Sequence, residues 1–278
     1  MLSGAAAVAA LCVAAWQYRS ASSAPLPEFR SYFMQPGFVD DAFAPFASIS
    51  ADPHIGEALV NHHLIAPDLI ARALSSAATE EPLTVVLISP DHFAGGIAPV
   101  TSVIARWPTP FGTLGPASEA ITVLASAGLV HLQSEPFAIE HGITNITMFI
   151  ARAIPRARIM PIIIRSDARP TQVDELAAAI VHLPGRVFVV GSFDFTHDST
   201  DAVAHSNDAR SLEILTRGDS AQASDIVVDS VPGIRLMMEI ARLRGHRFTL
   251  LGATNSARVL GDLSRTDVTS YLTGYWAP

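Results

Sequence analysis

Val-Val-Leu-Ile-Ser-Pro-Asp-His-Phe, residues 85–93, is the stretch that decides the fold of this chain of 278 residues. Its first four residues are apolar and mostly β-branched, which is typical of a strand buried on both faces in a parallel sheet. The stretch then turns polar and contains Asp91 and His92. Because open α/β sheets bind ligands just outside the carboxyl ends of their strands, both side chains are predicted to lie at a ligand-binding edge.

Two other segments repeat this design. The first is a predicted strand over residues 46–50 that leads to His54, and the second is a predicted strand over 186–191 that leads to Asp194 and His197. The carboxyl ends of neighbouring parallel strands meet at one edge of a sheet. We therefore expect the histidines that follow these strands to converge on one small region.

Strand-like and helix-like segments alternate over residues 46–276. This pattern predicts a single α/β domain with a largely parallel or mixed central sheet flanked by helices. The 3.6-residue periodicity of apolar residues predicts helices at 57–77 (interrupted at Pro67), 118–127, 139–153, 171–181, 204–216 and 232–244. Further strands are predicted at 84–88, 97–106, 129–132, 158–164 and 248–252, with a closing edge strand at 266–276.

The first 44 residues differ in composition from the rest. Residues 1–24 form an Ala-rich leader. Its apolar run, residues 2–16, is shorter than the roughly 20 apolar residues of a membrane span and resembles that of a signal peptide or anchor, without the usual basic start. An active leader predicts an exported or membrane-anchored protein, and otherwise we expect a cytoplasmic one. Residues 25–44, rich in Pro and Phe, are predicted to be an irregular aromatic arm before an α/β domain at 45–278.

Composition excludes several classes of protein. The net charge of −8, without a cluster of Lys and Arg, argues against a nucleic-acid partner. The single cysteine, Cys12, lies in the leader, so the α/β domain has no thiol for catalysis or for metal binding. No glycine-rich nucleotide-binding loop, serine nucleophile elbow or H-E-x-x-H motif is present, and no nucleotide cofactor is expected.

The remaining candidates for chemistry are histidines and carboxylates at predicted strand ends and helix starts. His54, His92 and His197 follow strands, and Glu140-His141 and Asp229 precede helices. Two imidazoles and one carboxylate on one face leave open positions on Fe(II), and the same donors hold zinc for hydrolysis.

Several neighbours of these residues have two interpretations. Asp194 either orients an imidazole or makes local hydrogen bonds in a turn. His62 and His63 lie in the helix predicted after His54, where packing or surface roles are expected, although one of them can face the cleft. We assign His63 and Asp91 to ligand binding at the cleft.

Six segments in order resemble motifs of the Memo family, also named AmmeMemoRadiSam system protein B. They are D-P-H-I-G (52–56), L-I-S-P-D-H (87–92), W-P-T-P-F-G (107–112), E-H-G-I (140–143), G-S-F-D-F-T-H (191–197) and T-S-Y-L-T-G-Y (269–275). The resemblance implies a fold similar to that of the class III (LigB-type) extradiol dioxygenases. It also implies a cleft with His54, His92 and His197, and with Glu140 and His141 at its edge.

The chain departs from the family pattern at two positions. Some members carry a cysteine where this chain has Asp229, which would restore a carboxylate ligand, and the second histidine of the family's S-H-H pattern is Phe93 here. We assign His54, His92, His197 and Asp229 to a metal site, and Glu140, His141, Asp194 and His197 to catalysis.

Three functions follow from this assignment. The leading hypothesis is a mononuclear non-heme iron site, with zinc or copper as other candidates, that supports oxygen-dependent redox chemistry on a small organic molecule. The alternatives are a non-catalytic module that binds a peptide or small ligand in the same cleft, and a metal-dependent hydrolase. A membrane is expected as a partner only through the leader.

Overall fold

Strand β2 (Thr84–Pro90) lies at the centre of the sheet in the computed structural model, which describes residues 25–31 and 33–278. It pairs in parallel with β7 (Arg158–Ile164) on one side and β8 (Val187–Ser192) on the other, and β8 pairs in parallel with β1 (Glu57–Val60). The apolar run that begins at Val85 is buried on both faces, as predicted. The predicted leader, residues 1–24, lies outside the described residues.

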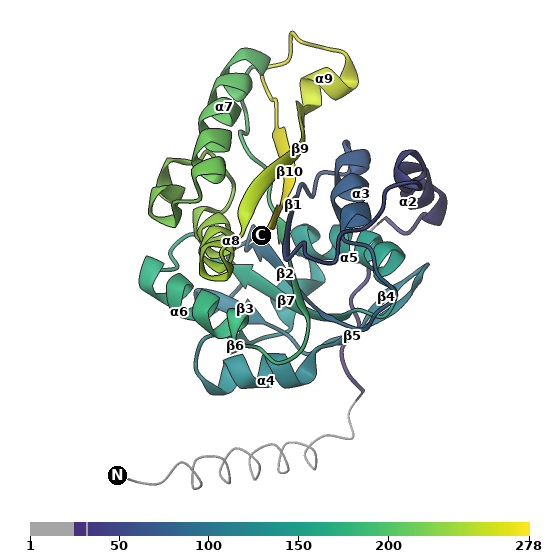
Figure 1. Ribbon diagram of the computed structural model, residues 1–278, viewed down its shortest axis with the longest axis vertical. Helices are drawn as coiled ribbons and strands as arrows, with labels where there is room; N and C mark the ends of the chain where they lie inside the picture. Colours follow the sequence, from purple (N-terminus) through teal and green to yellow (C-terminus); the bar gives the residue numbers. More distant parts are fainter. Residues whose placement is uncertain (1–24, 32) are drawn as a thin grey trace, which may run out of the picture.

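Antiparallel strands extend this parallel core into a mixed sheet of ten strands within the described residues (Figure 1). On the β1 side follow β10 (Ser270–Ala277) and β9 (Arg247–Asn255). On the β7 side follow β5 (Gly112–Pro116) and β4 (Trp107–Thr109), while β3 (Val100–Ser102) and β6 (His131–Leu132) extend the sheet beside the end of β7. The strand order is β4-β5-β7-β2-β8-β1-β10-β9.

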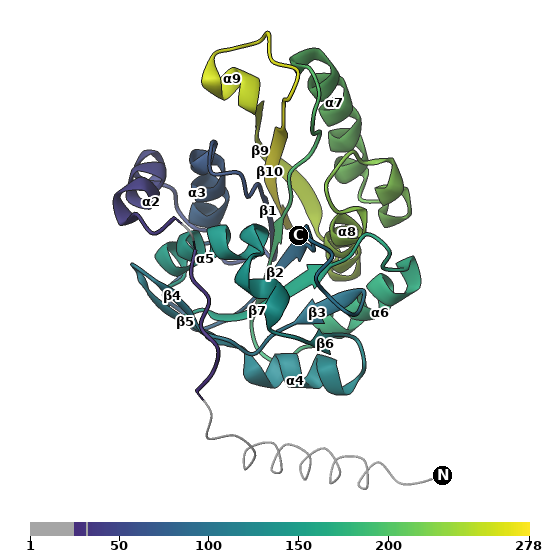
Figure 2. The same cartoon turned by 180° about the vertical axis from the view of Figure 1, so that it is seen from behind.

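Helices cover both faces of this sheet (Figures 1 and 2). One face packs against α3 (Pro67–Ser76) and α5 (His141–Ala153), and α2 (Pro36–Phe43) packs on these two helices. The other packs against α4 (Ser118–Ser126), α6 (Pro170–Val181), α7 (Asp201–Arg217) and α8 (Val231–Arg244). Alternate residues of β2 serve the two cores, because successive side chains of a strand point to opposite faces. The fold is therefore a single α/β domain with a mixed central sheet, as predicted.

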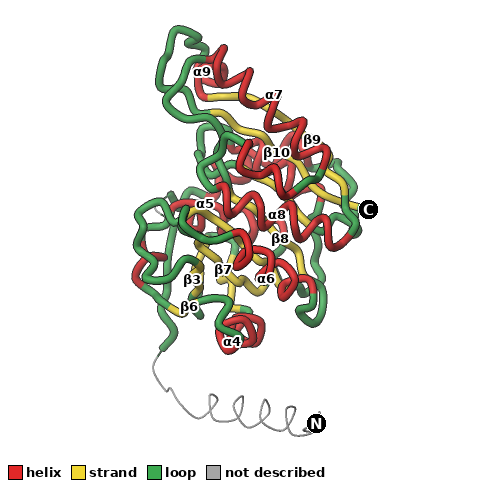
Figure 3. Tube along the Cα trace, turned by 90° about the vertical axis from the view of Figure 1, so that its left-hand side faces the viewer, coloured by secondary structure: helices red, strands yellow, loops and turns green. Residues whose placement is uncertain are grey.

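Short helical segments connect these layers. They are the 3-10 helices η1 (Ala44–Phe46), η2 (Glu135–Ala138) and η3 (Ser220–Asp225), and the five-residue helix α9 (Ser256–Leu260). Seen from the side, α7 and α9 flank the end of the β9–β10 ribbon that extends beyond the rest of the sheet (Figure 3). No helix in the described part of the chain is both long enough and apolar enough to cross a membrane.

The structure corrects the prediction for residues 46–77. No strand forms over 46–50, where η1 is followed by a turn, and the strand of this region is β1, at the start of the predicted helix. Only α3 is helical, and Pro67 begins it, in keeping with the preference of proline for the first turn. The sequence does not distinguish β1 from the start of a helix, because the strand is four residues long and begins with a charged residue, Glu57.

Two further elements differ from the prediction. The closing strand β10 is not an edge strand, because it lies between β1 and β9, and β9 forms the edge. The aromatic arm contains helix α2, and its phenylalanines pack on the domain: Phe29 contacts Trp107 with ring centroids 5.2 Å apart, and Phe43 contacts Phe149 at 6.1 Å.

A candidate metal centre

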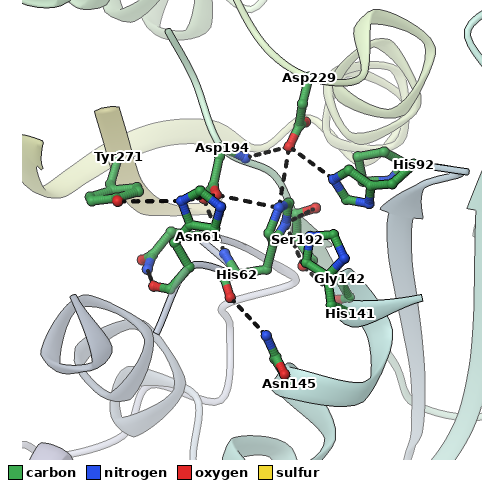
Figure 4. A network of polar contacts seen from close by, with 12 residues as sticks. Asn61, His62, His92, His141, Gly142, Asn145, Ser192, Asp194, Asp229 and Tyr271 are labelled. Carbon is green, nitrogen blue, oxygen red and sulfur yellow. Dashed lines mark hydrogen bonds and ion pairs between the residues drawn. The ribbon is translucent and has the colours of Figure 1, made fainter. Parts of the chain in front are cut away.

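The carboxyl ends of three neighbouring parallel strands carry a cluster of histidines and carboxylates (Figure 4). His62 and His63 follow β1, His92 follows β2, and Asp194 follows β8. The cluster is completed by Glu140 and His141 at the start of α5, by His197 beyond Asp194, and by Asp229 just before α8. The site thus lies where the topology of an open α/β sheet predicts it.

His62 is the buried centre of this cluster, with 1 % of its side chain exposed. Its Nε2 atom lies 3.3 Å from Oδ2 of Asp194 and 3.6 Å from Oδ2 of Asp229. Its backbone is fixed on two sides, since its amide donates to Oδ1 of Asp194 at 3.1 Å and its carbonyl accepts from Asn145 at 3.2 Å. The imidazole is therefore held with Nε2 between two carboxyl groups.

The two carboxyl groups are themselves fixed by the backbone. The amide of Asp194 donates to Oδ2 of Asp229 at 2.9 Å, and the amide of Asp229 donates to the carbonyl of Asp194 at 3.0 Å. The helix after Asp229 begins at a Ser230 side chain that accepts from the Gly233 amide, so the loop that carries Asp229 ends in a defined cap. Asp229 reaches Nε2 of His92 at 3.9 Å.

His92 is oriented by Glu140. Glu140 is 1 % exposed, and its Oε1 lies 2.7 Å from Nδ1 of His92 while its Oε2 accepts from the His92 amide at 3.0 Å. An ionised carboxylate is only an acceptor, so Nδ1 of His92 carries the proton and Nε2 is left as the free donor atom for a metal ion. The ring of His141 lies beside that of His92, with centroids 4.1 Å apart.

His63 and His197 lie on the outer side of the cluster. Nδ1 of His63 is 3.2 Å from Oδ2 of Asp194 and 3.4 Å from the hydroxyl of Tyr271. His197 is exposed, and its ring centroid lies 6.1 Å from that of His63. Together with Asp194 and Asp229, His197 forms one of three groups of donor atoms that lie within 4.8 Å of one another.

Burial sets the charges of the cluster. Burial lowers the pKa of His62 well below its usual value, and the neighbouring histidines His92 and His141 lower it further. Burial likewise raises the pKa of Asp194 to about 6 and raises that of Asp229 well above its usual value, an effect that the negative charge of Asp194 increases. Neutral imidazole is the form that binds metal ions, and a bound cation would allow both carboxyl groups to ionise.

The geometry fits a metal ion. Three buried atoms of the cluster make no hydrogen bond to another atom of the protein: Nε2 of His62, Oδ2 of Asp194 and Oδ1 of Asp229. Leaving buried polar atoms without partners costs free energy, so a cation that they bind together would offset this cost. Two donor atoms that bind one metal ion at about 2.1 Å lie roughly 3.0–3.4 Å apart, which is close to the 3.3 Å between the first two of these atoms.

The structure brings together most of the residues that the sequence suggests, but not all. His92, Glu140, His141, Asp194, His197 and Asp229 meet at the cluster, and so does His63, which was assigned to ligand binding. The prediction that His54 belongs to the metal site is wrong, because the structure places His54 away from the cluster. His54 is exposed and precedes β1, so it lies at the amino end of the parallel strands, opposite the cluster.

Asp91 is also not part of the cluster. Its two carboxylate oxygens accept hydrogen bonds from the amides of Gly95 and Gly96, at 2.9 and 2.7 Å. Asp91 therefore shapes the loop after β2, which is the turn role that aspartate often has after a strand.

The residue that sequence reasoning missed is His62. The signal was available, because Ala58-Leu59-Val60 followed by Asn61-His62-His63 repeats the pattern of an apolar run that ends in polar residues. Asn61 stabilises this turn, since its side chain donates to the carbonyls of His63 and Ala66 at 2.8 and 3.2 Å.

Comparison with known proteins identifies relatives. Residues 51–275 match the family described as Memo-like protein. The chain is 27 % identical to a MEMO1 family protein of Nitrosopumilus maritimus over 216 residues, which cover 74 % of this chain and 75 % of that protein. It is 29 % identical to one from Methanosarcina acetivorans over 199 residues, or 68 % of this chain and 74 % of the relative.

A solved structure is also similar. An uncharacterized protein from Escherichia coli K12 aligns with a TM-score of 0.48 at 10 % sequence identity, over 78 % of this chain and 99 % of that one.

Proposed function

The chain belongs to the Memo-like protein family, and we propose that its cluster holds a single iron ion for oxygen-dependent chemistry on a small organic molecule. His62 and His92 are the proposed imidazole ligands, and the carboxylate ligand is one of the two that face Nε2 of His62, Asp229 or Asp194. Two imidazoles and one carboxylate are the donor set of the facial triad of non-heme iron proteins. When bound, such an ion supplies open positions for dioxygen and substrate.

One observation carries the proposal. Nε2 of His62 and Oδ2 of Asp194 are buried, face each other at 3.3 Å and make no hydrogen bond. A structural pair of this kind would be expected to close a hydrogen bond, because an unsatisfied buried group is costly. A cation that both atoms face, together with Asp229, accounts for the arrangement.

The other residues of the cluster have roles that follow from their contacts. Glu140 fixes the ring of His92 through Nδ1, and such a carboxylate beside a ligand histidine raises its basicity. His141 and His197 are the candidates for moving protons, because burial lowers the pKa of each and both are partly open to solvent. A neutral imidazole near pH 7 both accepts and donates a proton.

The test is metal content. The full chain is purified without oxygen or chelators, loaded with Fe(II) or Zn(II), desalted and measured by elemental analysis. We expect about one iron per chain in the wild type and its loss in His62→Ala and in His92→Ala. His54→Ala is the matched control, because it removes an exposed histidine from the opposite end of the same strands and should leave the iron in place.

The outcomes separate the alternatives. Iron retained in both His62→Ala and His92→Ala, with circular dichroism unchanged, would refute the ligand assignment. Tight zinc in place of iron would favour hydrolysis, since zinc lowers the pKa of a bound water. No metal in the wild type would leave the cluster as a binding site without turnover.

A further inference from the structure

A cavity of about 390 Å³ lies beside the metal centre and shares His62 and His63 with it. Helix α9 contributes Leu260 to its lining, and the segment between α9 and β10 contributes Arg265. The other lining residues are Leu64, Ile65, Asn145, Ser256, Asp267, Thr269 and Tyr271. A cavity of this volume fits a small molecule, and two residues of the candidate metal site contribute to its lining.

Arg265 has an unused hydrogen-bond donor. Its Nε atom is buried and makes no hydrogen bond, although a terminal nitrogen of the same side chain is paired with Asp267. Among the described residues that line the cavity, Arg265 is the one permanent cation. A buried donor without an acceptor is costly. The Arg265 side chain as a whole is 34 % exposed, so an acceptor oxygen on a ligand can reach its guanidinium.

The rest of the lining limits the kind of ligand. Leu64, Ile65 and Leu260 give the cavity an apolar side, and Leu260 is 52 % exposed in the absence of any cover. Asp267 balances part of the charge of Arg265. One partly balanced guanidinium beside apolar side chains suits a group with a single negative charge and an apolar body, because the charge of Asp267 leaves less than one positive charge to neutralise.

The position of Arg265 relative to the metal centre is fixed by the backbone. Val268 donates to the carbonyl of Ser199, and Ser270 donates to that of Thr196, both at 2.9 Å. The segment after Arg265 is thereby tied to the loop that carries Asp194 and His197. Arg265 thus lies on a segment anchored beside the metal centre, and it lines the same cavity as His63.

We infer that this cavity binds a small organic monocarboxylate, with its carboxylate on Arg265, its apolar body against Leu64 and Ile65, and its other end toward His63. Catalysis on such an acid rests on the proposed function. Recognition of the carboxylate requires the cavity alone, so the two are tested separately.

The test uses straight-chain monocarboxylates of four to eight carbons, with the amides of equal length as uncharged controls. They are titrated into the full chain after removal of metal with a chelator, and binding is followed by calorimetry or ligand-observed NMR. At least one acid should bind at least tenfold more tightly than its amide. Arg265→Met should weaken that acid by about 10- to 100-fold, the range expected when a charged hydrogen bond is lost.

Two controls make the result specific. Arg247→Met removes an exposed arginine at the start of β9 and should leave the affinity unchanged. Arg265→Met should keep the iron content of the wild type, whereas His92→Ala, which removes a proposed metal ligand that does not line the cavity, should lose iron and still bind the acid. If the protein binds no iron, binding of the acid can still be measured. If it binds no acid, the iron content can still be measured.

Three outcomes would overturn the inference. They are the absence of binding across the whole series, equal affinity for acid and amide, and an unchanged affinity in Arg265→Met. Displacement of the acid by inorganic phosphate at lower concentration would also overturn it, because it would assign the cavity to a different anion.

Discussion

Glu140→Gln and Glu57→Gln are a matched pair of substitutions that separates support of the metal site from support of the fold. Both carboxylates are buried, with at most 1 % of the side chain exposed, and each lies against Nδ1 of a histidine: His92 at 2.7 Å for Glu140, and His246 at 2.8 Å for Glu57. They lie at opposite ends of the parallel strands, because Glu57 begins β1 whereas Glu140 lies at the carboxyl edge.

Glu140→Gln is expected to lower the affinity for metal, whereas Glu57→Gln is expected to lower the free energy of unfolding. Glutamine at position 140 removes the negative charge that holds the ring of His92, and loss of such support typically lowers metal affinity by about 10- to 100-fold, or roughly 1.4–2.7 kcal/mol. Glutamine at position 57 leaves Arg244, 2.7 Å away and 15 % exposed, without its counterion. Removing one partner of a buried pair costs about 3–5 kcal/mol of unfolding free energy, with no effect expected on the metal ion.

Competition with a chromophoric chelator measures the affinity for metal, and urea denaturation of the metal-free protein measures stability. Equal losses of metal affinity in both variants would show that the effect is transmitted through the whole fold, which would refute the reasoning. An affinity of Glu140→Gln within twofold of the wild type would refute it as well, since His92 would then not depend on its carboxylate partner.

Two further substitutions test local features of the fold. Burial raises the pKa of Asp208 from 3.8 to about 6, although the hydroxyl of Ser270 donates a hydrogen bond to its carboxylate at 2.6 Å. The folded state therefore binds this proton more tightly than the unfolded state does. The free energy of unfolding should then fall as the pH rises from about 4 to about 6. Asp208→Asn should remove up to about 2 kcal/mol of that fall in urea titrations at pH 4 and pH 7, and an unchanged pH slope would contradict it. A methyl group on Gly142 would lie 2.1 Å from Oγ of Ser89, so Gly142→Ala should displace the start of α5, lower the melting temperature and weaken metal binding. Ser89→Gly in the same chain should restore part of both losses, and a Gly142→Ala variant as stable as the wild type would show that the helix start can shift freely.

The sequence predicts the parallel core of this fold because its strands are long apolar runs. β2, β7 and β8 lie close to their predicted positions, and so do α5 and α8. Glu140 directly precedes α5, and Asp229 lies just before α8. β1 is different, since four residues with a charge at their start do not reveal a strand. Its pairing with β8 and β10, together with the burial of Glu57 against Arg244 and His246, decides its conformation, and these partners are more than 100 residues away in the chain.

The same long-range pairing decides which histidine reaches the candidate site. His54 precedes β1 and His62 follows it. The two histidines are eight residues apart in the chain, and they lie at opposite ends of the strand. A motif that contains His54 is therefore no guide to the site unless the strand is placed first. Arg265 was beyond prediction for a related reason, because its position depends on the pairing of Val268 and Ser270 with the loop that follows β8.

The identity of the residue at position 229 bears on which metal ion the cluster would prefer. Where some members of the Memo family carry a cysteine, this chain has Asp229, and the described cluster offers nitrogen and oxygen donors in place of a thiolate. Thiolates favour soft ions such as Cu(I), whereas imidazoles with carboxylates suit Fe(II), Mn(II) and Zn(II). Asp229→Cys should therefore shift the preference of the site toward Cu(I) if Asp229 is a ligand. A preference that does not change, in a variant that folds and binds metal, would place Asp229 outside the coordination of the ion and leave Asp194 as the carboxylate ligand.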